Sequence, residues 1–185
     1  MATGTLRLKL AAAASLLLLV GLGIYLAPLR PGVVALQLTF TPEAFVQVLQ
    51  AWGPEGVQRF RSHLLVDGLL LLNYGAAGYW AVTRTRFFQP LAPRLPLRWV
   101  ALVLPFAAVC DAGEDLLHWM LTGANALAPA VTMAPALYLL AGACATLKWL
   151  GIAGFVISAI YRLRSRSRCC TLPVSYTHLT LPTSD

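Results

Sequence analysis

Residues 10–27 read LAAAASLLLLVGLGIYLA, a stretch of eighteen residues without a charged side chain. A bilayer core about 30 Å thick needs about 20 apolar helical residues to cross it. Arg7 and Lys9 precede the stretch, no A-x-A cleavage site follows it, and Pro28 comes next. We therefore expect residues 10–27 to form a retained membrane-spanning helix rather than a signal peptide.

The whole chain shares this apolar character. Of its 185 residues, 58% are hydrophobic and only 11% are charged, and the mean hydropathy is +0.71. Soluble domains have about a quarter of their residues charged. This composition excludes a soluble globular domain, a disordered chain and a collagen-like chain, and indicates an integral membrane protein. The net charge of +7 does not indicate nucleic-acid binding, because a basic patch needs a soluble surface.

Three further stretches are long and apolar enough to span a bilayer. They cover about residues 63–82, 99–121 and 136–161. The predicted fold class is therefore all-α: a polytopic membrane protein with four transmembrane helices in an up-down bundle. We expect residues 1–172 to form one domain.

The basic residues predict the orientation of the bundle, because Lys and Arg are enriched on the cytoplasmic side of a membrane. Most of them flank the spans on one side: Arg7, Lys9, Arg84, Arg86, Arg94, Arg98, Arg162, Arg164, Arg166 and Arg168. The opposite side has Arg30, Arg59 and Arg61. We expect a multi-pass protein of the bacterial inner membrane with both termini in the cytoplasm.

The segment between the first two spans contains its own helix signal. Thr41, Pro42 and Glu43 are typical of an N-cap, a first helical position and a first turn. An amphipathic helix is expected over about residues 42–52, ending at Gly53. It would cap the bundle or lie on the outer membrane surface; a substrate lid is the alternative.

Ionisable residues inside the predicted spans are the main anomaly of the sequence. They are Asp67, Asp111, Glu114, Asp115, His118 and Lys148. A charge in lipid costs at least a few kcal/mol, so these groups should face the bundle interior or a wet cavity and have partners. Depth in the spans predicts an ion pair between Asp111 and Lys148, joined by Asn73 and Tyr74.

A second group is expected nearer the outer leaflet. His63 precedes Asp67 by one helical turn, and Asp115 and His118 lie at a similar depth in the third span. These four side chains are the weak candidates for a divalent metal site. No HExxH, DDxxD or HxxxxD pattern and no CxxC pair occurs, so no cofactor is otherwise predicted.

Three interpretations of the acidic cluster are open. The first is a structural polar network. The second is the site of a membrane-embedded, metal-dependent hydrolase or transferase that acts on lipid near the outer leaflet. The third is a path for protons or ions, or a binding site for a cationic or hydroxylated lipid. Whether the protein is an enzyme is therefore undecided. The candidate catalytic residues are Asp67, Asp111, Glu114, Asp115 and His118.

Small residues predict where helices approach closely. Gly75 and Gly78 give the second span a face that suits helix packing. The alternative is a homo-oligomer through the same face, which ion passage would need because four helices are few for a transporter. The other expected partners are membrane lipids.

The stretch of residues 38–120 resembles a family of small bacterial four-helix membrane proteins of unknown function. An outer F-T-P-E segment is followed by one aspartate in the next helix and a D-x-x-E-N motif in the third. The matching residues are Phe40, Thr41, Pro42, Glu43, Gly53, Gly56, Asp67, Asp111 and Glu114. Asp115 stands where that motif has asparagine. The resemblance implies a fold and groups Asp67, Asp111 and Glu114 as a unit.

The last residues have a different character. Pro173 to Thr183 reads PVSYTHLTLPT, which resembles a translated sequencing adapter. We expect residues 173–185 to be a non-native tail and the native sequence to end near Leu172.

Overall fold

The computed structural model describes residues 2–91, 96–123 and 133–169. These residues form α1 (Ala2–Leu26), α2 (Val33–Gln37), α3 (Pro42–Thr83), the short 3₁₀ helix η1 (Gln89–Leu91), α4 (Leu97–Leu121) and α5 (Pro135–Cys169). No strand occurs among them, which confirms the all-α prediction. The predicted tail, residues 173–185, lies outside the described part of the chain.

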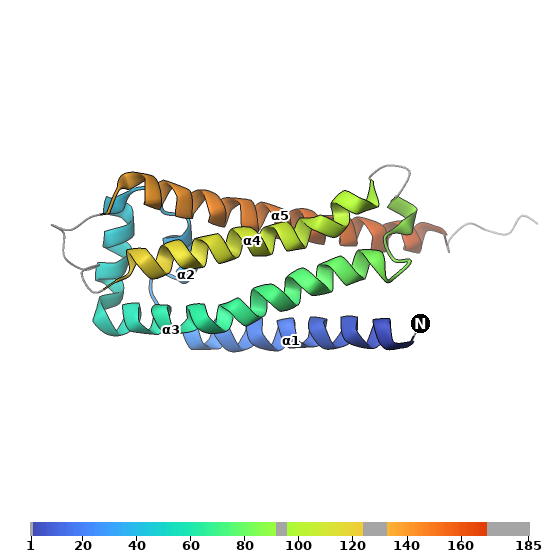
Figure 1. Ribbon diagram of the computed structural model, residues 1–185, viewed down its shortest axis with the longest axis horizontal. Coiled ribbons are helices and arrows are strands. Elements are labelled where there is room, and N and C mark those ends of the chain that lie inside the picture. The colour runs from blue at the N-terminus through green and yellow to red at the C-terminus, as the bar shows by residue number, and fades with distance from the viewer. Residues whose placement is uncertain (1, 92–95, 124–132, 170–185) are drawn as a thin grey trace, which may run out of the picture.

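The long helices α1, α3, α4 and α5 lie side by side and alternate in direction (Figure 1). The main contacts run in chain order: α1 packs on α3, α3 on α4, and α4 on α5. Consequently α1 and α5 occupy the two edges of the arrangement.

Two of these helices contain a candidate membrane span by length and apolar character. They are Leu6–Leu26 in α1, with a mean hydropathy of 2.0, and Pro135–Arg164 in α5, with 1.7. The first begins before the predicted residue 10 and ends at Leu26 instead of residue 27, and the second extends beyond both predicted bounds, 136 and 161. The other two predicted spans lie in α3 and α4 and contain buried or half-buried acids: Asp67 in α3, and Asp111, Glu114 and Asp115 in α4.

Helix α3 is bent near its beginning. The hydroxyl of Thr41 accepts a hydrogen bond from the backbone N–H of Ala44 (3.3 Å), and Pro42 occupies the first turn. Gly53 has φ 66° and ψ −179°, and the helix resumes at Pro54. The predicted helix over residues 42–52 is therefore the first part of α3, and the run that contains the second predicted span begins earlier than residue 63.

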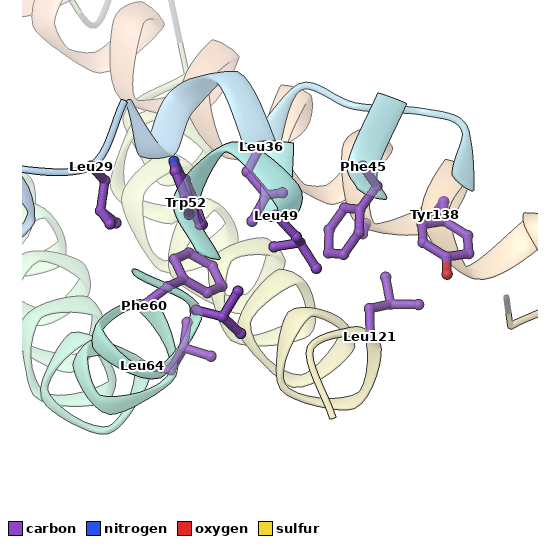
Figure 2. Packing of buried hydrophobic residues seen from close by; sticks show 11 residues of the cluster. Leu29, Leu36, Phe45, Leu49, Trp52, Phe60, Leu64, Leu121 and Tyr138 are labelled. Atoms are coloured by element: carbon purple, nitrogen blue, oxygen red, sulfur yellow. The ribbon is translucent and has the colours of Figure 1, made fainter. Parts of the chain in front are cut away.

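The first part of α3 crosses one end of the molecule (Figure 1). Its apolar face packs into a buried cluster with residues from the later part of α3, from α2, α4 and α5, and from the segment between α1 and α2 (Figure 2). The cluster consists of Leu29, Leu36, Phe45, Leu49, Trp52, Val57, Phe60, Leu64, Leu121, Tyr138 and Ala141. The indole N–H of Trp52 donates to the carbonyl of Pro31 (2.6 Å). This packing makes residues 42–52 a cap on the bundle end.

Candidate functional site

A buried lysine holds two carboxylates together at the centre of the bundle. The Nζ of Lys148 in α5 lies 2.9 Å from Oδ1 of Asp111 and 2.6 Å from Oε2 of Glu114, both in α4. Lys148 is 4% exposed and Glu114 is 0% exposed. The pair of Asp111 and Lys148 expected from the sequence is present, and Glu114 is its third member.

Tyr74 connects α3 to the same group. Its hydroxyl donates to Oδ2 of Asp111 (3.0 Å), so both oxygens of Asp111 have partners. Asn73 does not join the network, because its amide donates to the carbonyl of Leu69 one turn earlier (2.7 Å).

Three aspartates lie around this centre. Asp67 from α3 and Asp111 and Asp115 from α4 each offer a carboxylate oxygen, and these oxygens lie within 4.8 Å of one another. Three carboxylates so close attract a cation, a proton or a hydrogen-bond donor. The ammonium of Lys148 already meets this demand at Asp111, which disfavours a divalent ion there.

The two histidines predicted to join Asp67 and Asp115 pack against aromatic rings. His118 is 1% exposed, stacks on Phe45 (5.8 Å between ring centroids), and has Nδ1 3.5 Å from Oε1 of Glu114. The ring of Phe60 packs against both His63 and His118, at 4.7 and 5.6 Å. Of the four residues expected to converge, Asp67 and Asp115 lie together with Asp111, a group that does not include the histidines. His63 lines the same cavity as Asp67.

A cavity of about 490 Å³ adjoins the charged centre. Its walls are mostly apolar side chains of α1, α2 and α5. Its ionisable groups come from α3, α4 and α5: His63, Asp67, Tyr74, Asp111 and Lys148 line it, and Ser15 of α1 adds a hydroxyl. The sequence did not predict this cavity, because it depends on how far α1 and α5 stand apart.

Close packing of α3 on α4 positions the aspartates. Gly75 and Gly78 are buried, and a Cβ at Gly78 would lie 2.6 Å from the Cβ of Leu104 in α4. The small face predicted from the sequence is thus used within the chain, where it brings Asp67 and Asp111 to the same level.

Comparisons of the chain with protein-family models, with curated proteins and with solved structures give no match. The resemblance to four-helix bacterial membrane proteins therefore stays a prediction, and the site has to be interpreted from its own geometry.

Proposed function

We propose that the protein is a multi-pass inner-membrane protein with four spanning helices, and that it binds a membrane lipid in the cavity between α1 and α5. The cavity carries this proposal, because it joins apolar walls to one polar centre. Small-molecule sites commonly have this composition and a volume of about 300–1,000 Å³.

The contacts of Lys148 support the proposal that α3 and α4, which hydropathy alone does not select, also span the membrane. A span through α5 places Lys148 within the bilayer. Asp111 and Glu114 contact its ammonium, so α4 must share that depth, and the bond from Tyr74 to Asp111 brings α3 to the same level. Charged groups at this depth are expected to face the bundle interior, as these do.

The chemistry of a membrane lipid matches the two parts of the cavity. Its acyl or isoprenoid chain would exchange contacts with the bilayer for contacts with the leucines of α1 and with Ile152, Phe155 and Val156 of α5. Its headgroup would meet Asp67 and Asp111 instead of water. The same charged network also joins α3, α4 and α5, so a structural role and lipid binding are compatible.

Filling the cavity tests the proposal. Gly23 lines the cavity, and a Cβ added there has nothing within 4 Å, so the side chain of Gly23→Leu should extend into the ligand space. Native mass spectrometry of the full chain, released from mild detergent, should show a retained lipid on the wild type and its loss in Gly23→Leu.

Gly154→Leu is the matched control. Gly154 is an exposed helical glycine of α5 with the same free space, and it is outside the cavity lining. It should retain the lipid. Equal lipid retention by all three proteins, or no lipid on any of them, would contradict the proposed site.

A further inference from the structure

We infer that the headgroup bound in this cavity is a hydrogen-bond donor without negative charge, as in a long-chain alcohol or a long-chain amine. The inference rests on the proposed lipid site and adds the chemical class of its ligand. Three features support it: an excess of carboxylates, a buried histidine with a free acceptor nitrogen, and cavity donors that already have partners.

The charges at the polar centre oppose an anionic headgroup. Oxygens of Asp67, Asp111 and Asp115 lie within 4.8 Å of one another, and Glu114 is also in contact with Lys148. One lysine therefore faces four acids. A phosphate or carboxylate ligand would add another negative charge to a region where Coulomb repulsion is poorly screened.

His63 adds a hydrogen-bond acceptor from an independent position. It is 5% exposed, and its Nδ1 pairs with the carbonyl of Phe60. A carbonyl only accepts, so Nδ1 carries the hydrogen, and Nε2 of the neutral ring presents a lone pair. Among the described residues, no hydrogen bond to this Nε2 is found. Asp67 lies four residues on, which puts both acceptors on one helix face beside the cavity.

The donors that line the cavity are largely committed. Lys148 contacts Asp111 and Glu114, and the Tyr74 hydroxyl donates to Asp111. The hydroxyl of Ser15 donates to the carbonyl of Ala11, and Gln37 uses Oε1 to accept from Trp149. The uncharged amide N–H₂ of Gln37 is the donor left over. A ligand that supplies its own hydrogen therefore complements this site best.

Four probes with the same sixteen-carbon chain separate the headgroup from the chain: hexadecanol, hexadecylamine, palmitate and methyl palmitate. Each is titrated into the full chain in detergent, and binding is followed by native mass spectrometry. The alcohol or the amine should bind about tenfold or more tighter than the other two, because only these two headgroups supply a hydrogen-bond donor to the acceptors of the site. The tighter binder of the two shows whether the donor of the ligand is a hydroxyl or an amine.

Variants connect the preference to the named residues. His63→Leu and Asp67→Leu should each reduce the preference for the alcohol or amine over methyl palmitate, while Gly154→Leu should keep it. Helical content and melting temperature show whether each variant is folded. If Asp67→Leu does not fold, Asp67→Asn, which keeps one acceptor oxygen, is used in its place.

The failures of the two proposals are distinguishable. Equal binding of all four probes, with loss of binding in Gly23→Leu, would overturn the headgroup inference and leave the lipid site intact. Preference for palmitate would also overturn it. No binding of any probe would overturn the proposed lipid site itself.

Discussion

Lys148 is the residue on which the charged centre depends. Its ammonium contacts Asp111 and Glu114 at 2.9 and 2.6 Å in a place where water is largely absent. A buried ion pair adds little to stability compared with apolar residues of the same shape, but removing one partner leaves an uncompensated charge. The three side chains should therefore behave as a unit when they are mutated.

We predict that Lys148→Met destabilises the fold by about 3–5 kcal/mol, the range for breaking a buried pair. The triple variant Lys148→Met, Asp111→Asn, Glu114→Gln should recover most of this loss, because no charge is then left unpaired. Reversible unfolding in mixed detergent measures both. If Lys148→Met is as stable as the wild type, Asp111 and Glu114 must bind another cation or hold protons.

The pair of Asp111 and Lys148 was predictable because both residues lie near the middle of apolar segments, and depth alone brings them to one level. The contacts of Glu114 and His118 were harder to predict. They depend on the rotation of α4 about its axis, which packing against Phe45 and Phe60 determines. For the same reason the sequence placed the histidines with the aspartates.

At the scale of elements, the bend in α3 depends on one glycine. Gly53 has φ 66° and ψ −179°, a region that is essentially restricted to glycine. Pro54 then suits the first position of the following helical run, because it needs no hydrogen-bonded N–H there. The sequence predicted the end of a helix at Gly53 but not that helical structure resumes at once.

We predict that Gly53→Ala destabilises the protein by about 1–3 kcal/mol through backbone strain. Steric contact is excluded as the cause, since a Cβ at Gly53 has nothing within 4 Å. Gly68→Ala is the control: it is helical with equal free space and should be neutral or stabilising by up to about 1 kcal/mol. Thermal unfolding of both variants measures the change in stability. Equal changes for Gly53→Ala and Gly68→Ala would exclude backbone strain at Gly53 as the cause.

Helix α2 is too short to be predicted from the periodicity of its apolar residues. Its residues read VVALQ, five residues that are too few to display a helical repeat. They fold because Leu36 is buried in the cluster beneath the cap, a tertiary contact that the local sequence does not report.

At the scale of the whole molecule, one end of the bundle is basic. The beginning of α1, the connection from α3 to α4 and the last turns of α5 lie at the same end in Figure 1. Exposed arginines there include Arg7, Arg84, Arg86 and Arg98. The opposite end is closed by the cap. This asymmetry is the basis for proposing cytoplasmic termini.

Thiol labelling tests this orientation. In a background with all four native cysteines replaced, Glu55→Cys marks the capped end and Arg86→Cys marks the basic end; both positions are exposed. A membrane-impermeant maleimide should label Glu55→Cys in right-side-out vesicles and Arg86→Cys in inside-out vesicles. The reverse pattern would invert the topology, and labelling of both residues from one side would rule out an odd number of spans between them.

The chain-order packing of α1, α3, α4 and α5 also has a consequence for biosynthesis. Each long helix after α1 packs on the long helix made before it, so the bundle can assemble stepwise during synthesis. The cavity differs, because α1 and α5 both contribute to its walls. In the proposed topology, a chain halted after α4 would have its aspartates and Glu114 within the bilayer without the ammonium of Lys148. Docking of α5 thus adds the last wall of the cavity and brings the Lys148 ammonium to Asp111 and Glu114 in the same step.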